Sequence, residues 1–116
     1  MEIYKGNERK REAVLKLRER NQRLIEKHIG CYYEVDQRSK NVVKDDHVVF
    51  IEKIYQDDYV LYQRSDLHGD MVMRITEALA ILNSNVYYPT KVSKQRWDEL
   101  VLVREMKKHL QETDND

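Results

Sequence analysis

Residues 47–64 read HVVFIEKIYQDDYVLYQR, and this stretch decides the fold. Both ends are rich in β-branched and aromatic residues, which favour strands. Between them lies the polar segment Gln56-Asp57-Asp58, whose short side chains tolerate turn geometry. The stretch therefore predicts two antiparallel strands joined by a tight turn.

The two faces of this hairpin are both apolar. With Asp57 and Asp58 as the loop residues, the predicted register pairs Tyr55 with Val60. One face then carries Phe50, Ile54, Tyr59 and Leu61, and the other carries Val49, Ile51, Tyr55, Val60 and Tyr62. A hairpin with one wet face would alternate apolar and polar residues. We therefore expect one face to line a barrel-like core and a flanking helix or a partner to cover part of the other. A one-residue slip would only exchange the faces.

Length and composition indicate one globular domain, residues 1–116. Hydrophobic residues make up 41% of the chain, enough for a core, while charged residues reach 36%. No apolar run approaches the length of a membrane span, and the N-terminus lacks the apolar segment of a signal peptide. The single cysteine, Cys31, excludes an intramolecular disulfide. These features predict a cytoplasmic protein.

The net charge is zero, but the charges are segregated along the chain. Residues 5–28 hold nine Lys or Arg against four Glu, whereas residues 31–70 hold five Lys or Arg against nine Asp or Glu. Residues 71–111 are basic again, and the tail after Gln111 is acidic. This polarity within a neutral molecule falls short of the basic footprint that nucleic-acid binding produces.

Residues 7–28 predict an N-terminal helix with Asn7 as its N-cap and Gly30 as a left-handed residue after its end. Positions 14, 17, 21, 24 and 28 form a short heptad pattern with Asn21 in the seam. The helix could lie across the barrel as an ordinary amphipathic helix. Alternatively, it could pair with a second copy, since a seam Asn fixes register in a coiled coil. Two heptads are too short to hold such a dimer without the rest of the fold.

The remaining segments predict short strands and a second helix. Expected strands are 31–35, 42–43, 71–76 and 86–88, with a loop at 36–41, a turn at 44–46 and a loop at 65–70 in which Gly69 can take a positive φ. Residues 77–82 switch to helix formers, and Pro89 stops the last strand. Ser93 is placed to cap a helix at 94–111, and residues 112–116 form a frayed acidic tail.

The predicted class is therefore α+β: a small antiparallel barrel of about five short strands, residues 31–89, between two terminal helices. In element order alone, with NSNVYY (83–88) after a helical turn before the last strand, this segment resembles the Src-homology-3-like barrels. The acidic-aromatic motif and the paired tryptophans of the peptide-binding family are absent. The resemblance therefore implies a fold and no proline-rich ligand.

Residues suited to catalysis are sparse. Three isolated glycines exclude a Gly-rich phosphate loop. His28 and Cys31 are too few ligands for zinc, and they make a weak candidate for a thiolate–imidazole pair. Asp66, His68 and Asp70 could offer a metal three groups, but such clusters in polar turns are usually solvated. We therefore predict no enzyme activity, no metal and no cofactor.

Tyrosines dominate the aromatic content of the barrel segment: Tyr32, Tyr33, Tyr55, Tyr59, Tyr62, Tyr87 and Tyr88, against a single Phe in the chain. Tyrosine places apolar area at a wettable surface, which is typical of contact faces as well as of barrel rims. Our first hypothesis is a small regulator or adaptor that binds another protein. Its anchors would be Tyr33, Tyr55, Tyr62 and Tyr88, with Asp57 and Asp58 steering the partner. A short charged chain of this kind would suit a viral or mobile-element modulator or inhibitor of a host factor.

Two other functions remain open. Basic residues of the first helix, represented by Arg11, Arg18, Arg20 and Arg23, together with barrel aromatics, could bind nucleic acid. The glutamates of that helix and the acidic barrel weigh against this. A small-ligand receptor or an enzyme is the third alternative, which no motif supports. Self-association into a dimer, through the first helix or the tyrosine-bearing sheet, is a separate expectation.

Overall fold

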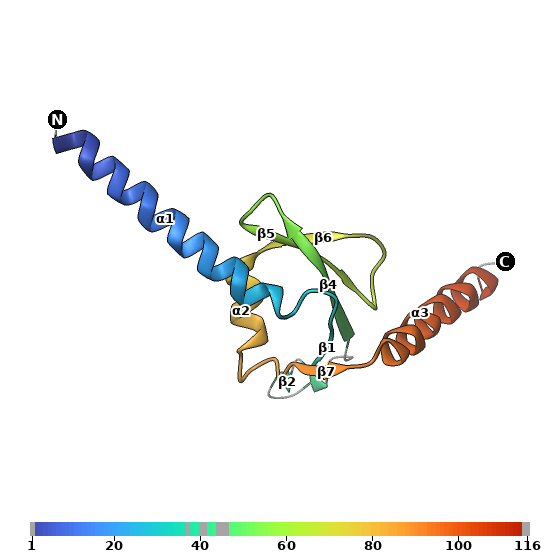
Figure 1. The fold of residues 1–116 in the computed structure, drawn as a ribbon. Coiled ribbons are helices and arrows are strands. Elements are labelled where there is room, and N and C mark those ends of the chain that lie inside the picture. The colour runs from blue at the N-terminus through green and yellow to red at the C-terminus, as the bar shows by residue number, and fades with distance from the viewer. Residues whose placement is uncertain (1, 37, 40–41, 44–46, 115–116) are drawn as a thin grey trace.

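The computed structural model describes residues 2–36, 38–39, 42–43 and 47–114 and shows an α+β fold (Figure 1). Three helices are present in this part of the chain: α1 (Glu2–Glu26), α2 (Ile75–Leu82) and α3 (Lys94–Asp114). The main sheet consists of β1 (Tyr32–Val35), β4 (His47–Tyr55), β5 (Tyr59–Arg64), β6 (Met71–Arg74) and β7 (Thr90–Val92). A separate ribbon pairs β2 (Arg38–Ser39) with β3 (Val42–Val43).

The main sheet is antiparallel, five-stranded and open, in the order β6-β5-β4-β1-β7. The expected closed barrel is therefore not confirmed. The two outermost strands, β6 and β7, are short and lie at opposite edges, and α2 occupies the connection between them. The order of elements agrees with the prediction, including a helical segment before the last strand, except that β2 forms within the predicted loop at 36–41.

The predicted hairpin forms at the centre of the sheet, but its register differs by one residue from the predicted one. Tyr55 pairs with Tyr59, so the loop has three residues, Gln56-Asp57-Asp58, of which the first two have φ of 48° and 63°. Glu52 is an extra residue on β4, because Ile51 pairs with Tyr62 and Lys53 with Leu61. Such a β-bulge changes the alternation of faces. The predicted assignment of Ile54 to the face opposite Ile51 is therefore wrong.

The core lies between the inner face of the sheet, the end of α1 and the helix α2. Its fully buried members are Ile25, Val60, Ile75 and Ala78. Ile54, Met73, Leu79 and Leu82 pack against them and are partly buried. Apolar burial of this kind is the main term that stabilises a small domain. It also fixes the C-terminal end of α1 to the body of the protein.

The outer face of the sheet is covered at one end by α3. Tyr32 stacks on Phe50 with ring centroids 4.6 Å apart, and Trp97 of α3 lies 5.8 Å from the Tyr32 ring. Beside these rings, Nη2 of Arg96 donates a hydrogen bond to Oε1 of Glu34 at 2.7 Å. A flanking helix thus covers part of the outer face, as expected, whereas the inner face belongs to an open sheet and not to the expected barrel.

Several boundaries differ from the predictions. α1 starts at Glu2 and ends at Glu26, so Asn7 lies inside the helix; Gly30 follows in a left-handed conformation, with φ of 78°. Ile75 and Thr76 begin α2. The segment 86–88 is not a strand, and the last strand comes after Pro89. α3 follows Ser93 and includes residues 112–114 of the predicted tail. The predicted turn at 44–46 and residues 115–116 lie outside the described residues.

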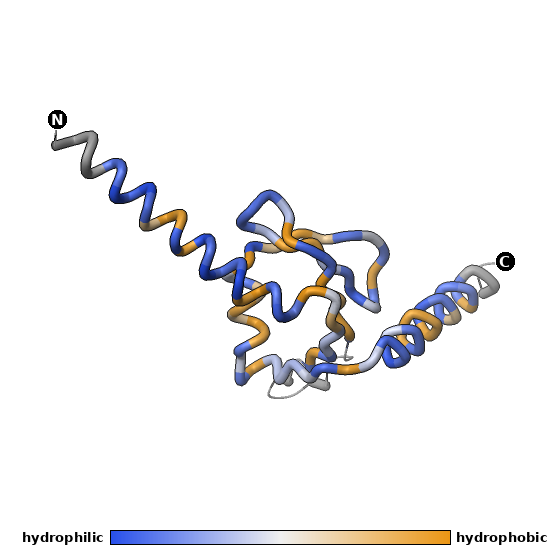
Figure 2. Tube along the Cα trace, viewed as in Figure 1, coloured by the Kyte–Doolittle hydropathy of each residue, from blue (hydrophilic) through white to orange (hydrophobic). Residues whose placement is uncertain are grey.

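The molecule is elongated, with principal extents of 72 × 31 × 25 Å. α1 and α3 project from the sheet in different directions (Figure 1). Hydrophobic segments alternate with hydrophilic ones along both projecting helices (Figure 2). Neither these helices nor α2 combines the length and apolar content needed to cross a bilayer, within the part of the chain that is described.

Candidate functional site

A groove runs between α1 and the sheet, with a cavity volume of about 190 Å³. We call it the α1 groove. Its residues come from three places: α1, the β4–β5 loop, and the junction of β6 with α2. They are Val14, Leu17, Arg18, Asn21, Asp57, Asp58, Tyr59, Arg74, Ile75 and Thr76.

Polar contacts fasten α1 to the β4–β5 loop along this groove. Arg18 donates two hydrogen bonds to the carboxylate of Asp58, from Nε at 3.0 Å and from Nη2 at 3.1 Å. Gln22 donates from Nε2 to the carbonyl oxygen of Asp57 at 2.9 Å. The carbonyl oxygen of Asp58 accepts the backbone N–H of Ile75 at 2.8 Å, so the same loop also holds the start of α2. The groove therefore has a defined shape.

The charges in the groove are largely matched. The hydrogen bonds and charge of Asp58 raise the pKa of Arg18, which keeps its positive charge. The guanidinium of Arg74 lies over the ring of Tyr59, 5.9 Å from the ring centroid, in cation–π geometry. The groove thus presents apolar side chains between charges that already have partners, an arrangement suited to contact with the surface of another protein.

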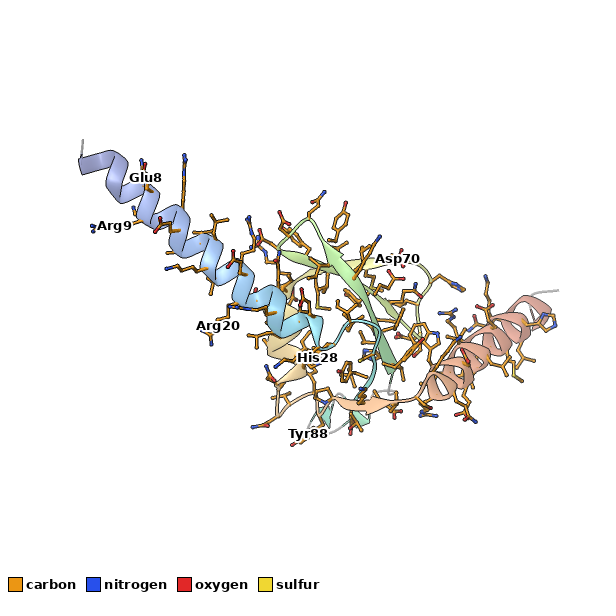
Figure 3. The ribbon with its side chains drawn as sticks, viewed as in Figure 1. Glu8, Arg9, Arg20, His28, Asp70 and Tyr88 are labelled. Atoms are coloured by element: carbon orange, nitrogen blue, oxygen red, sulfur yellow. The ribbon has the colours of Figure 1, made fainter. Side chains whose placement is uncertain are left out.

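α1 carries an exposed apolar stripe that begins in the α1 groove and continues past it to Leu24. Val14, Leu17 and Leu24 are 57%, 56% and 38% exposed. Their spacing places them along one side of the helix, next to the buried Ile25. Basic side chains surround the stripe, and Arg9 and Arg20 point away from the sheet (Figure 3). An apolar stripe with a basic border is therefore open to solvent.

The predicted tyrosine anchors do not form one surface. Tyr33 is buried, and its hydroxyl lies 2.6 Å from Nδ1 of His28, so the expectation that Tyr33 is an exposed anchor is wrong. Tyr62 is half-buried and lines a second cavity. Tyr55 is exposed at the end of β4 near the loop, whereas Tyr88 is exposed in the segment before β7. Strand alternation turns Tyr33 and Tyr62 to the inner face and Tyr55 to the outer one, whereas Tyr88 lies outside any strand.

The other predicted site residues fall into two groups. Asp57 and Asp58 are exposed and lie in the α1 groove, as does Arg18. Arg18, predicted as a nucleic-acid contact, is instead paired with Asp58. Arg11, Arg20 and Arg23 are exposed on α1. The structure therefore joins one member of the basic set to one member of the acidic set, and the sequence reasoning missed this pairing across 40 residues.

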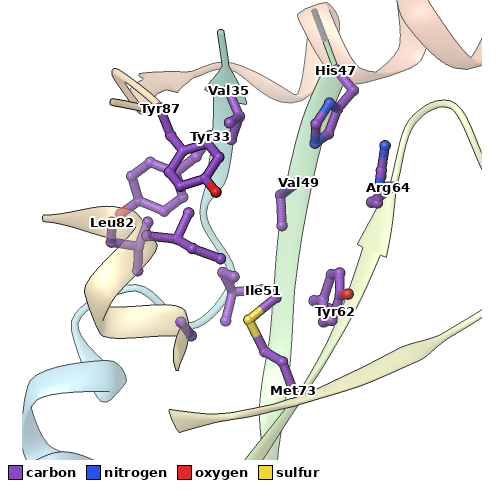
Figure 4. Close-up of a pocket in the computed structure, with 12 residues that line it drawn as sticks. Tyr33, Val35, His47, Val49, Ile51, Tyr62, Arg64, Met73, Leu82 and Tyr87 are labelled. Atoms are coloured by element: carbon purple, nitrogen blue, oxygen red, sulfur yellow. The ribbon is translucent and has the colours of Figure 1, made fainter. Parts of the chain in front are cut away.

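A second cavity, of about 150 Å³, lies on the inner face of the sheet (Figure 4). We call it the inner cavity. Its floor is set by the strand register: Val35 is opposite His47, Tyr33 is opposite Val49, Val49 is opposite Arg64, and Ile51 is opposite Tyr62. The other lining residues are Met73, Ala78, Ile81, Leu82 and Tyr87. The sequence placed Val49, Ile51 and Tyr62 on one face, and extending that alternation by two residues along each strand would have found His47 and Arg64.

Burial shifts the titration of groups around the inner cavity. Burial lowers the pKa of His47, and the charge of Arg64 adds to this, whereas Asp66 opposes it. Burial likewise raises the pKa of Tyr33 to about 12, and the neighbouring Cys31 adds to the effect. Burial raises the pKa of Asp66, but its hydrogen bonds and charge pairing with Arg64 outweigh this and lower the pKa overall. At neutral pH the cavity therefore holds a neutral imidazole beside a charged guanidinium.

The sequence candidates for chemistry lie apart in the structure. Asp66 accepts hydrogen bonds from Arg64, Asp70 accepts one from Gln63, and Nε2 of His68 faces Glu105 at 3.4 Å. Cys31 Sγ lies 3.9 Å from the carbonyl oxygens of Lys27 and Ile29. Within residues 2–36, 38–39, 42–43 and 47–114, no three His, Cys, Asp or Glu side chains gather as metal ligands would.

Comparisons of the chain with protein-family models, with curated proteins and with solved structures gave no match.

Proposed function

We propose that this protein is a non-enzymatic binding module, a regulator or adaptor, whose partner is a protein that lays an acidic amphipathic helix against α1. The apolar side of that helix would contact Val14 and Leu17 in the α1 groove and continue along the stripe to Leu24. Tyr55 and the exposed Asp57 border the same end of the sheet and would contribute at the rim.

The observation that carries the proposal is the solvent-exposed apolar stripe on a helix that projects from the body. Exposed apolar residues that share one side of a helix, rather than being scattered, are typical of a binding surface. Helix-in-groove recognition uses apolar residues at this helical spacing. The helix is held at its base by Ile25 and by the Arg18–Asp58 pair, so the stripe is already oriented for docking.

Charge indicates the chemistry of the partner. Residues 5–28 carry nine Lys or Arg against four Glu, and Arg11, Arg20 and Arg23 are exposed. A partner helix with acidic flanks would complement this border and associate faster at low salt. In a heptad with Val14 and Asn21 at a, the e and g positions include Arg11, Arg18, Arg20 and Lys27. Pairing of two α1 helices through the stripe would bring these cations together, which favours a different chain as partner.

The experiment uses two substitutions of the same kind on the same helix. Leu17 and Leu15 have similar exposure, 56% and 50%, but lie about 200° apart around α1, since each residue advances the helix by about 100°. Three baits would be used in a nuclease-treated lysate of the source organism: the wild type, Leu17→Asp and Leu15→Asp. Captured proteins would then be purified, and their direct binding measured by calorimetry at several salt concentrations.

We expect a partner that binds the wild type and Leu15→Asp alike and loses at least about tenfold in affinity for Leu17→Asp, since an apolar anchor becomes a charge. Binding through a segment that is neither helical nor acidic would contradict the proposal, as would equal loss in both variants.

Retention of nucleic acid with a steep dependence on salt, reduced by replacing Arg11, Arg20 and Arg23, would support the nucleic-acid alternative instead. If light scattering detected a dimer of the wild type that is absent in Leu17→Asp, the occupant of the stripe would be a second copy of the chain.

A further inference from the structure

The inner cavity has the construction of a small-molecule site. Four adjacent strands, β6, β5, β4 and β1, supply its floor, and α2 supplies Ala78, Ile81 and Leu82 as the opposite wall. Most of the lining is apolar, whereas His47 and Arg64 lie together at one end of the cavity (Figure 4). Ligand pockets in proteins characteristically combine an apolar body with a few polar groups that converge at one place.

The polar end is suited to an anion. Asp66 accepts hydrogen bonds from Nε of Arg64 at 3.0 Å and from Nη2 at 2.8 Å, which engages one edge of the guanidinium. A guanidinium has five N–H groups in a planar fork, so its other edge can bind a second carboxylate. The neutral imidazole of His47 can donate one further hydrogen bond from a ring nitrogen. Arg64 and His47 can therefore both donate hydrogen bonds to an anion at this end of the cavity.

The apolar end sets the size of the occupant. A closed cavity of about 150 Å³ lined by aliphatic and aromatic side chains is large enough for benzene, as an engineered protein cavity of that volume shows. The inner cavity has a volume of about 150 Å³ and is lined by Val49, Ile51 and Met73 at this end. A cavity of this volume would admit one ring or a short branched chain together with one polar group.

We propose that the inner cavity binds a small monocarboxylate with a compact apolar body, of the size of benzoate. The carboxylate would sit between Arg64 and His47, and the body would lie over Val49 and Ile51 against α2. This inference does not depend on the proposed partner of α1. Because Ala78 lines the cavity and belongs to the same buried cluster as Ile25, an occupant would also touch the element that anchors α1.

The test titrates benzoate into ¹⁵N-labelled protein and follows amide chemical shifts, with benzyl alcohol as the uncharged ligand of the same shape. Val49→Phe fills the cavity from β4. Val72→Phe is the matched control, because Val72 is 47% exposed on β6 and does not line the cavity. Ile81→Phe fills the cavity from α2 and serves as the second variant if Val49→Phe does not fold. Arg64→Gln removes the charge at the polar end.

We expect saturable shifts in the amides of Val49, Tyr62 and Arg64, with a millimolar dissociation constant that suits so small a ligand. Benzyl alcohol should bind about tenfold more weakly, and Arg64→Gln should remove that preference, since a hydrogen bond to a charged group is lost. The filled variants should not bind, whereas Val72→Phe should bind as the wild type does. Absence of saturable shifts, shifts confined to the basic surface of α1, or unchanged binding in both filled variants would overturn the proposal.

Discussion

Arg18 and Asp58, 40 residues apart in the chain, form a two-point ion pair that ties the middle of α1 to the tip of the central hairpin. The pair joins the basic segment of the sequence to the acidic one. It explains how a helix that projects beyond the sheet keeps a fixed direction. It also removes one cation from the surface that would otherwise attract a polyanion.

The Arg18–Asp58 pair should contribute modestly to stability. The two side chains are 32% and 52% exposed, so solvent screens the attraction. A double-mutant cycle of Arg18→Gln and Asp58→Asn, followed by urea unfolding, should give a coupling free energy of about 0.3 to 1 kcal/mol that declines with salt. A coupling of zero at low salt would show that the two groups do not pair in solution.

Ile25 should carry far more of the stability than its neighbour Leu24. Ile25 is fully buried among Val60, Ile75 and Ala78, whereas Leu24 is 38% exposed on the apolar stripe. Ile25→Ala should lower the free energy of unfolding by about 2 to 4 kcal/mol, because it leaves a cavity in the core. Leu24→Ala should cost less than about 1 kcal/mol. Equal losses in the two variants would mean that α1 is rotated from the orientation described.

Glu52 should behave as a residue inserted into β4, so its removal should keep the facing of its neighbours. Ile51 pairs with Tyr62 and Lys53 with Leu61, which leaves Glu52 without a partner on β5, and its side chain accepts a hydrogen bond from Gln63. Deletion of Glu52 places Ile51 and Ile54 two positions apart, so both isoleucines still face the core and we expect a cooperative thermal transition to remain. Glu52→Ala keeps the bulge and should melt within a few degrees of the wild type, which circular dichroism would measure. Loss of the cooperative transition in the deletion variant alone would contradict this account of the register.

Local patterns in the sequence predicted the elements, and long-range contacts decided the rest. The hairpin, both terminal helices and the two-sided apolar character of β4 follow from residue types and periodicity. The register could not be predicted, because a bulge has no strong signature: Glu52 resembles any exposed strand residue. The start of α2 was also missed, since Ile75 and Thr76 have strand propensity and become helical through burial of Ile75 and its hydrogen bond to Asp58.

In the candidate sites, too, local patterns predicted some features and long-range contacts decided the others. Exposure of Asp57 and Asp58 follows from turn chemistry, but the pairing of Asp58 with Arg18 depends on how α1 packs, which Ile25 determines through the core. The predicted anchors include tyrosines from different faces, because composition does not show toward which face of the sheet a residue points. Once the register is known, Tyr33 and Tyr62 turn inward to the inner cavity, and Tyr55 and Tyr59 turn outward.

Stability should fall as the solution is acidified from pH 7.5 to pH 5. The pKa values of His28 and His47 are both lowered in the folded protein, in each case mainly by burial. A histidine with a lowered folded pKa is stabilising while it is neutral, so its contribution is complete above the unfolded pKa of about 6.5 and is lost as protons bind the unfolded chain below that value. Chemical unfolding at half-unit steps should show the decline. His47→Gln should reduce the slope of this decline and leave the part due to His28, whereas His68→Gln, on an exposed loop, should leave the slope unchanged. An equal slope in the two variants would show that His47 does not contribute.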